Sequence, residues 1–359
     1  MEKVVNKLKS FYKDKTVLVT GHTGFKGSWL SLFLNSLGAK VIGYSLEPNT
    51  TPNLYSLANI ENVVESYISD IRSFDSLKTV MDKHKPDVVF HLAAQPLVID
   101  SYKDPRYTYE TNVMGTINIL DVIRTSNYVK SFVNVTTDKV YKNNEWLWGY
   151  REDEELDGFD PYSNSKSCSE LVTKTYKRSF FDDKEDVSIS TVRAGNVIGG
   201  GDFSNNRIIP DCMKALLESK PIEIRNPNSV RPYQHVLEPL YAYILIGYLQ
   251  YNDKFYSDSY NVGPYEDDCV TTGNLVKLFV DNSYKKIDIK QVGKEGPHEA
   301  NFLKLDVSKI KNKIKWTPKW SVEDAIQKTI QWIKVFESNK EDIRKIMYNQ
   351  IDEYLEMEV

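Results

Sequence analysis

Residues 15–34 read KTVLVTGHTGFKGSWLSLFL, a strand-like run, a glycine-rich turn and a helix-like run in immediate succession. Residues 15–20 are apolar and β-branched, which predicts a short buried strand. Residues 28–34 have the composition of a helix, and Gly38 is placed to end it. A glycine turn between a strand and a helix is the context in which a dinucleotide-binding fingerprint becomes informative, although an ordinary βα turn shares the outline.

Each glycine of the turn has its own expected role. Gly21 permits a tight turn, Gly24 lets the backbone approach a pyrophosphate, and Gly27 lets the helix pack on the strand. The helix N-terminus would offer free N–H groups to the phosphates. His22 and Lys26 could both supply counter-charge, although Lys26 could equally be solvated. The expected cofactor contacts from this stretch are Gly21, His22, Thr23, Gly24, Phe25, Lys26 and Gly27.

A second strand is predicted over residues 40–46, and its end distinguishes between two dinucleotides. An NAD site usually has an acidic residue there for the ribose hydroxyls, whereas an NADP site has an arginine for the 2′-phosphate. This chain has Ser45, with Glu47 two residues further on, and no arginine follows. NAD is therefore the expected cofactor. A third strand, 66–72, contains Asp70 and Ile71; Asp70 could accept a hydrogen bond from the adenine amino group or lie solvated in a turn.

Strands and helices continue to alternate as far as residue 193. Strands are predicted over residues 86–95, 132–135 and 187–193, with helices over 73–84 and from 109 to about 126. This alternation is typical of α/β proteins with a doubly wound parallel sheet. After residue 195 the sequence changes to short basic and apolar segments, which predict a smaller C-terminal α+β lobe.

The strand at residues 86–95 ends in small side chains that would leave space beside a cofactor. The cofactor contacts expected at this end are His91, Leu92, Ala93 and Ala94, although His91 is more typical of a structural residue than of a catalytic one. Asn112 lies in the following helix, where a polar side chain would have to satisfy a backbone kink or a ligand.

The chemistry is expected from residues after the strand at 132–135. Thr137, Asp138 and Lys139 follow this strand, at the edge where α/β proteins bind ligands. Tyr162 and Lys166 are four residues apart and share one face of a predicted helix. A nearby ammonium favours the phenolate, so the pKa of Tyr162 is expected to fall from about 10. Such a phenol can take a proton from a sugar hydroxyl, although the same spacing also occurs on exposed helix faces.

Composition excludes several classes of function. Hydrophobic residues make up 41% of the chain, enough for a folded core, and the formal charge of −4 argues against a nucleic-acid surface. Cys168, Cys212 and Cys269 fit neither a disulfide framework nor a metal site, and they suit a reducing cytoplasm. No apolar segment suited to a signal peptide follows Met1, and no apolar run reaches about 18 residues, so no membrane span is expected.

Together these stretches resemble the extended short-chain dehydrogenase/reductases that act on nucleotide sugars, over nearly the whole chain. The strings VTGHTGFKGSWL at 19–30, TDK at 137–139, RAGNVIGGGD at 193–202 and RPYQHVLEPL at 231–240 are similar to those of the CDP-glucose 4,6-dehydratases. The superfamily marks also include Asp70, the string at 91–94, Asn112 and the Tyr162–Lys166 pair. Dehydratases of thymidine-linked glucose place Glu where this chain has Lys139, and the CDP-glucose group more often has Trp in place of Tyr233.

The resemblance implies a lyase that uses bound NAD and forms a 4-keto-6-deoxy sugar with loss of water. Tyr162 would take the C4 hydroxyl proton, helped by Lys166 and Thr137. Asp138 is the candidate acid for the departing C6 hydroxyl. Lys139 is the candidate base for the C5 proton, or else it stabilises the enolate. The proton positions within the Asp138–Lys139 pair are not assignable from sequence.

The resemblance further implies a division of the chain between two ligands. Residues 1–195, with a return segment of about 233–262, would form the NAD-binding Rossmann domain, and 196–232 with 263–359 the nucleotide-sugar-binding lobe. The candidate substrate contacts are Gln95, Asn196, Arg207, Arg231, Tyr233 and His235. Arg207 and Arg231 suit a diphosphate, although spacing alone fits surface arginines equally well.

A cytoplasmic homodimer is also implied, paired through the helices at 107–126 and 162–181. Its apolar candidates, either interface or core, are Ile117, Leu120, Leu171 and Tyr176. The expected role is in making deoxysugars for lipopolysaccharide O-antigen. The alternatives are a dehydratase of another nucleotide sugar, such as a GDP-linked heptose, a 4-epimerase, which needs no acid–base pair for elimination, and a non-catalytic NAD-binding scaffold.

Overall fold

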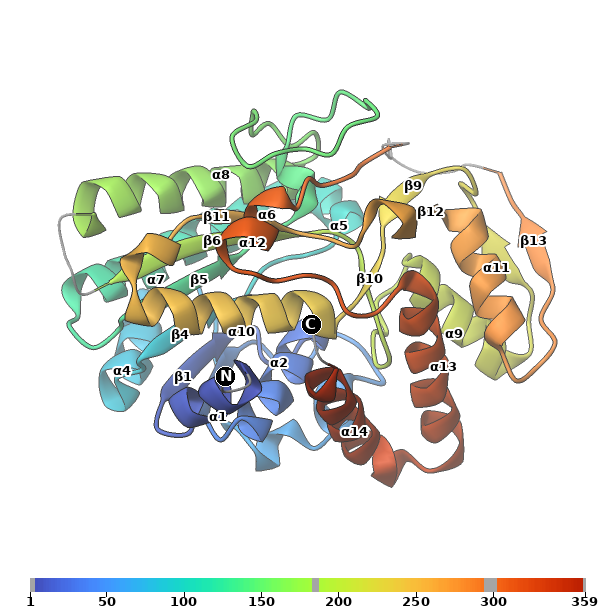
Figure 1. The fold of residues 1–359 in the computed structure, drawn as a ribbon, viewed down its shortest axis with the longest axis horizontal. Coiled ribbons are helices and arrows are strands. Elements are labelled where there is room, and N and C mark those ends of the chain that lie inside the picture. Colours follow the sequence, from blue (N-terminus) through green and yellow to red (C-terminus); the bar gives the residue numbers. More distant parts are fainter. Residues whose placement is uncertain (1–3, 183–186, 294–301, 358–359) are drawn as a thin grey trace.

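A parallel β-sheet forms the centre of the computed structural model, which describes residues 4–182, 187–293 and 302–357. Its seven strands run in the order β11-β6-β5-β4-β1-β2-β3 (Figure 1). They are β1 (Thr16–Thr20), β2 (Lys40–Ser45), β3 (Glu65–Ile68), β4 (Val88–His91), β5 (Ser131–Val135), β6 (Ser188–Ala194) and β11 (Ser259–Val262). The order reverses between β1 and β4, the kind of switch point where such sheets open a crevice for ligands.

Helices cover both faces of the sheet, as the doubly wound prediction requires. One face carries α1 (Val4–Tyr12), α2 (Phe25–Ser36) and α10 (Leu237–Asn252), and the other carries α4 (Phe74–His84), α7 (Gly115–Thr125) and α8 (Pro161–Tyr176). Alternation along β1 supplies both cores: Val17 and Val19 join the cluster under α2 and α10, whereas Leu18 joins the cluster under α4 and α7. The predicted fold class is confirmed.

The helix predicted from residue 109 is interrupted near its start. A short α6 (Pro105–Tyr109) continues into a π-helical turn, η2 (Glu110–Met114), before α7 begins. Asn112 lies in this turn and bonds to backbone outside the helix: its Oδ1 accepts from the Gln95 N–H at 2.8 Å, and its Nδ2 donates to the Gln95 carbonyl at 3.1 Å. The irregularity expected at Asn112 is therefore present as a π-helical turn, and the Asn112 side chain anchors the loop after β4.

The C-terminal part forms a smaller lobe of short strands and helices. Two strand pairs occur there, antiparallel β9–β12 and parallel β8–β13, beside α9 and α11. The bounds are α9 (Ile208–Glu218), β8 (Ile222–Ile224), β9 (Val230–Pro232), β12 (Cys269–Thr271), α11 (Thr272–Asn282) and β13 (Ile289–Gln291). Other short elements include α3 (Leu54–Leu57), α5 (Val98–Lys103), β7 (Val197–Ile198), β10 (Gln234–His235) and α12 (Ser308–Lys313).

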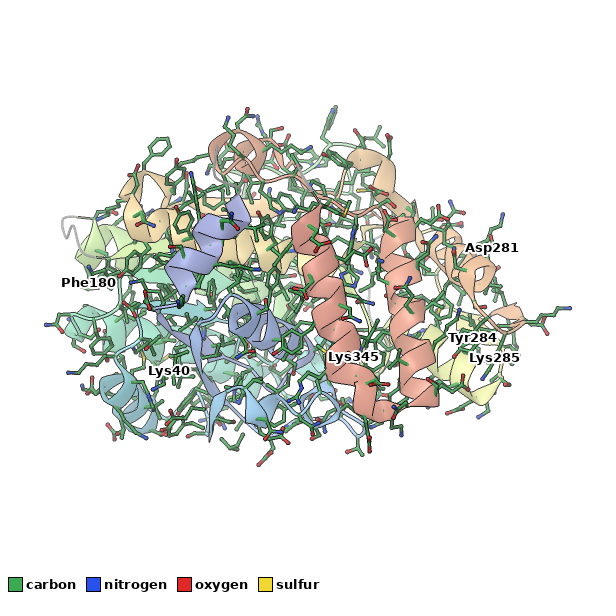
Figure 2. The ribbon with its side chains drawn as sticks, turned by 60° about the horizontal axis from the view of Figure 1, so that its bottom comes forward. Lys40, Phe180, Asp281, Tyr284, Lys285 and Lys345 are labelled. Atoms are coloured by element: carbon green, nitrogen blue, oxygen red, sulfur yellow. The ribbon has the colours of Figure 1, made fainter. Side chains whose placement is uncertain are left out.

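Two final helices tie the lobe back to the sheet layer. Figure 2 shows α13 (Val322–Ser338) and α14 (Ile343–Glu356) side by side. The Tyr348 hydroxyl of α14 donates to Asn35 Oδ1 on α2 at 2.6 Å. Glu238, at the start of α10, accepts hydrogen bonds from the backbone N–H groups of Lys319 and Trp320 and from the Tyr354 hydroxyl. Within the described ranges, no helix is both long and apolar enough to cross a membrane.

Candidate active site

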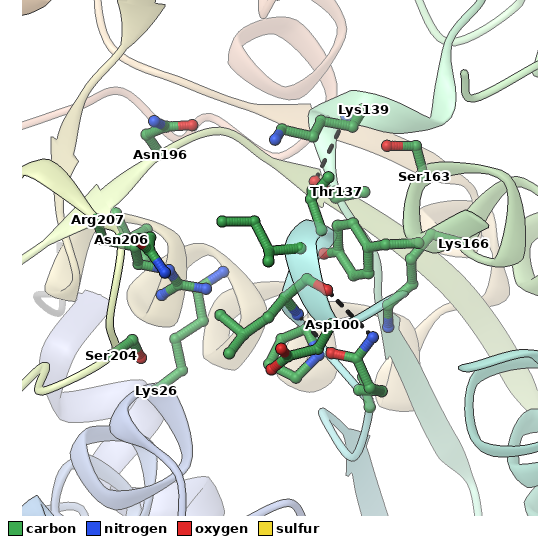
Figure 3. Close-up of a pocket in the computed structure, with 18 of the residues that line it drawn as sticks. Lys26, Asp100, Thr137, Lys139, Ser163, Lys166, Asn196, Ser204, Asn206 and Arg207 are labelled. Atoms are coloured by element: carbon green, nitrogen blue, oxygen red, sulfur yellow. Dashed lines mark hydrogen bonds between the residues drawn. The ribbon is translucent and has the colours of Figure 1, made fainter. Parts of the chain in front are cut away.

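A cavity of about 1860 Å³ opens between the carboxyl ends of the central strands and the smaller lobe (Figure 3). It gathers residues that are far apart in the sequence, from the glycine turn to the second half of the chain. The predicted site residues that line it are Gly21, Thr23, Gly24, Phe25, Lys26, Gly27, Asp70, Ile71, Leu92, Ala93, Ala94, Gln95, Thr137, Asp138, Lys139, Tyr162, Lys166, Asn196, Arg207, Arg231 and Tyr233. Four others, His22, His91, Asn112 and His235, do not line it.

The glycine turn has the shape that a dinucleotide pyrophosphate needs. Gly21 has a φ of +77°, and a Cβ there would lie 2.8 Å from the Ala93 nitrogen. A Cβ on Gly27 would lie 2.1 Å from the Gly21 oxygen, so only glycine lets α2 start this close to β1. Gly24 precedes α2, and within the described residues no side chain caps it. The first N–H groups of α2 are therefore left to an anion in the cavity.

Two polar side chains shape the far end of this groove. Thr23 bonds to the Ser45 hydroxyl at 2.9 Å and donates to the Leu46 carbonyl at 2.8 Å, which joins the glycine turn to the end of β2. Asp70 lines the cavity but is held by Arg72, which forms an ion pair with it at 2.8 Å. The same arginine also pairs with Glu110 at 3.1 Å, so its charge is shared between two carboxylates.

Tyr162 and Lys166 both reach the cavity from the first turns of α8. The Asp160 side chain caps this helix by accepting from the Ser163 N–H at 3.0 Å, and the Lys166 ammonium donates to the Val135 carbonyl at the end of β5 at 3.2 Å. Burial raises the pKa of Tyr162 to about 12, and the Thr137 hydroxyl and the Arg207 charge only partly offset this. The predicted lowering of that pKa is therefore wrong, because desolvation outweighs the neighbouring charges.

Lys166 and Asp138 are shifted toward their neutral forms. Burial lowers the pKa of Lys166 to about 8, against the opposing charge of Glu170. Burial raises the pKa of Asp138, although Lys139 and the Thr137 hydrogen bond oppose the rise. Asp138 Oδ1 accepts from the Thr137 hydroxyl at 3.0 Å, whereas Oδ2 is buried and has no partner among the described residues. A carboxyl group in this setting is suited to hold a proton and to donate it.

Sequence reasoning missed a buried ion pair behind these groups. Arg193, at the end of β6, donates to both carboxylate oxygens of Glu170, at 3.0 and 3.1 Å, and to the Tyr141 hydroxyl at 2.7 Å. Glu170 also accepts from the hydroxyls of Thr136 and Thr191. The pair thus fixes the turn that presents the residues after β5. Two features of the sequence could have indicated this pair: Arg193 ends an apolar predicted strand, and Glu170 lies one helical turn after Lys166.

His22 and His235 were predicted to contact ligands, and the structure corrects both. The His22 ring lies under Gly43 of β2, where a Cβ would meet it at 2.4 Å, and its Nε2 bonds to the Ser66 hydroxyl at 2.7 Å. Burial lowers its pKa to about 4, so it offers no counter-charge to a pyrophosphate. His235 is buried between Trp29 and Trp320, with ring centroids 5.9 and 4.8 Å away.

The side chains of His91, Asn112 and Gln95 form hydrogen bonds with protein groups around the cavity. His91 bonds to the Thr20 hydroxyl at 2.8 Å beneath the sheet edge, so the cofactor contact expected of it is wrong and its structural interpretation holds. Asn112 supports the loop after β4 instead of a ligand. Gln95 lines the cavity, but its side chain bonds within its own loop and to Thr108.

A Rossmann crevice with a buried tyrosine–lysine pair and an acid–lysine pair after β5 defines the class as extended short-chain dehydrogenase/reductases. The chain belongs to the family described as GDP-mannose 4,6 dehydratase, whose sequence profile matches residues 18–329. A CDP-glucose 4,6-dehydratase of Salmonella typhimurium is 43% identical and covers 97% of this chain and 98% of its own length. A CDP-paratose 2-epimerase of Salmonella typhi is 29% identical, over 88% of this chain and 98% of that protein.

Solved structures agree on the fold. A dTDP-glucose 4,6-dehydratase from Bacillus anthracis, crystallised with NAD, superposes with a TM-score of 0.75 at 24% identity, over 92% of this chain and 99% of that one. A UDP-glucose 4-epimerase from Thermotoga maritima, crystallised with UDP-glucose, gives a TM-score of 0.76 at 24% identity, over 89% of this chain and 99% of that one. At this level of sequence identity, both similarities are evidence for the fold alone.

Proposed function

We propose that this protein converts CDP-D-glucose to CDP-4-dehydro-6-deoxy-D-glucose and water, as a nucleotide-sugar 4,6-dehydratase. The observation that carries the proposal is Asp138, a buried carboxyl group with a raised pKa that shares one cavity with Tyr162 and Lys166. An oxidation at C4 needs only the tyrosine and lysine, whereas elimination of water also needs an acid and a base. The 43% identity to a CDP-glucose 4,6-dehydratase supports the choice of nucleotide.

The cofactor is NAD, and the residues of the first half fit it. The open turn at Gly24 and the free N–H groups of α2 would hold the pyrophosphate, and the small side chains of Ala93 and Ala94 leave room beside β4. When bound, the oxidised nicotinamide would accept a hydride from C4, return it to C6, and favour the Tyr162 phenolate through its positive charge. Leu92 and Ile71 line the same groove.

Tyr162 takes the proton of the C4 hydroxyl, with the Thr137 hydroxyl beside it as a hydrogen-bond partner. Lys166 donates to the Val135 carbonyl at the edge of the cavity and accepts the proton of the phenol when its own amine is neutral. The ketone formed at C4 makes the C5 proton acidic. Asp138 then protonates the departing C6 hydroxyl, and Lys139 removes the C5 proton or stabilises the enolate.

The smaller lobe binds the nucleotide and its diphosphate. Asn196, Arg207, Arg231 and Tyr233 line its side of the cavity, and Tyr233 bonds to Thr272 at 3.1 Å. The proposed division assigns the cofactor to residues 1–195 and about 233–262, and the nucleotide sugar to residues 196–232 and 263–359. It is supported by the positions of α10 and β11, which lie in the sheet layer although they follow residue 232. Of the predicted substrate contacts, Gln95 and His235 have side chains engaged elsewhere.

We also propose a homodimer in the cytoplasm, through the helices that contain α7 and α8. Leu171 on α8 is 49% exposed, which supports an interface there, whereas Leu120 on α7 is fully buried and belongs to the core. We further propose that the product is used to make deoxysugars for lipopolysaccharide O-antigen. Sedimentation at micromolar concentration tests the dimer, and a monomer would reject it.

The test of the reaction is incubation of the purified protein with glucose linked to CDP, dTDP, GDP and UDP. We expect a product lighter by one water from CDP-glucose, with no net consumption of NAD. A product of unchanged mass would indicate epimerisation and would reject the dehydratase. A preference for another nucleotide would keep the reaction and correct the substrate.

A further inference from the structure

Lys26 extends from the glycine turn into the cavity, and its ammonium has no hydrogen-bond or ion-pair partner among the described residues. The side chain is half-buried. In Figure 3 the ends of the Lys26 and Arg207 side chains lie close together, one from the start of α2 and the other from the residue before α9. Two cations that converge in a partly desolvated cavity repel each other unless an anion lies between them.

The neighbouring carboxylates do not supply this anion. Asp202 forms an ion pair with Arg207 at 3.1 Å, and this uses one carboxylate for one guanidinium. Asp138 is buried among cations, yet burial still raises its pKa toward the neutral form. Burial, and to a smaller extent the charge of Arg207, lowers the pKa of Lys26 to about 8, although Asp138 opposes the shift, so the charged form of Lys26 is disfavoured in the cavity. An anion bound between Lys26 and Arg207 would stabilise the charged form of Lys26.

The direction of the Lys26 side chain identifies which anion it meets. The first backbone N–H groups of α2, which no side chain among the described residues caps, are available to the cofactor pyrophosphate. The side chain points toward Arg207 and Asp138, on the side of the smaller lobe and of the reacting sugar. Under the proposed function, the anion that would enter on this side is the diphosphate of the substrate.

We propose that Lys26 binds the diphosphate of the nucleotide sugar together with Arg207, so that one turn contacts the cofactor through its backbone and the substrate through its side chain. This inference rests on the proposed function, and it assigns Lys26 to the substrate, whereas the sequence prediction gave it to the cofactor or to solvent. Lys26 is therefore a substrate-binding residue contributed by the cofactor-binding half of the chain.

The experiment measures equilibrium binding of CDP, of cytidine and of NAD to Lys26→Met (K26M) and to the unchanged protein. Loss of one charge-assisted phosphate contact should weaken CDP binding by roughly 10- to 100-fold. Cytidine has no phosphate, so its binding should not change, and NAD binding should also be unchanged. K26R should retain most of the affinity, and K26Q carries the same prediction as K26M if the latter is unstable.

Lys103→Met (K103M) is the matched control. Lys103 lines the same cavity, but its ammonium is exposed and paired with Asp100 at 2.8 Å, so its removal should leave CDP binding unchanged. Weaker NAD binding with normal CDP binding in K26M would overturn the inference and return Lys26 to the cofactor. Equal CDP binding in K26M and the unchanged protein would overturn it as well.

Parallel titrations with UDP, GDP and dTDP separate this inference from the proposed function. If the protein prefers one of these over CDP, the substrate proposal is wrong, and the same K26M ratio measured with the preferred nucleotide still decides the role of Lys26. If the unchanged protein binds no nucleoside diphosphate, both proposals fall.

Discussion

Replacing Asp138 with Asn tests the acid assigned to the elimination step. Asparagine has nearly the same shape, and its Oδ1 can keep the hydrogen bond that Thr137 donates at 3.0 Å. The buried Oδ2 has no partner among the described residues, so an amide nitrogen there breaks no existing bond. The substitution therefore removes one property, the ability of this side chain to donate a proton to the departing hydroxyl.

The size of the effect follows from that single loss. General acid catalysis contributes roughly 100- to 10,000-fold, so D138N should slow water loss by this factor, or about 3–5 kcal/mol of activation free energy. Oxidation at C4 uses Tyr162 and Lys166, which D138N leaves intact. It should therefore proceed at close to the normal rate, and the reduced cofactor should accumulate.

Two readouts distinguish the steps in a single turnover. The near-ultraviolet absorbance of reduced nicotinamide reports C4 oxidation, and the product mass reports loss of water. D138N should give the first signal without the second, whereas D100N, which alters an exposed carboxylate lining the same cavity, should give both. Formation of the dehydrated product at the normal rate in D138N would refute the acid role.

Three further substitutions test other parts of the account. Y162F should slow C4 oxidation by roughly 100-fold or more, with no reduced-cofactor absorbance; a normal transient would contradict the base role. R193M leaves the Glu170 carboxylate buried without its cation and should cost about 3–5 kcal/mol in urea unfolding, most of it recovered in an R193M/E170M double variant; a loss below about 1 kcal/mol would contradict the buried pair. Burial raises the pKa of Glu238 from 4.5 to about 7, so the folded state binds more protons between these values. Stability should fall on the order of 3 kcal/mol as the pH rises through this window, and E238Q should lack the fall; the same slope in E238Q would contradict it.

The sheet was predictable because its strands are short, apolar and separated by helices. β1 to β6 lie where the predicted runs are, with ends moved by a few residues: β3 ends at Ile68, before Asp70. β11 was harder, because SYNV at 259–262 is four residues long and is defined by its pairing with β6. Its position depends on α10 packing against the sheet, which local patterns do not report.

The sequence predicted most of the residues that line the cavity, but it did not predict the direction of every side chain or the groups that each one contacts. His22 and His235 stand in informative strings, yet both side chains turn into the core; Gly43, opposite the His22 ring, was the available signal for close packing. The Glu170–Arg193 pair depends on strand β6 lying beside β5. The pKa of Tyr162 was misjudged because sequence reveals a neighbouring charge but not the extent of desolvation.

The central claim is that two electrons leave C4 of the sugar and return to C6 of the same molecule. The direct test is one turnover of CDP-glucose carrying deuterium at C4, followed by mass and magnetic-resonance analysis of the product. The account predicts a product that has lost one water and carries the deuterium at C6. A dehydrated product without the label, or a label still at C4, would contradict it.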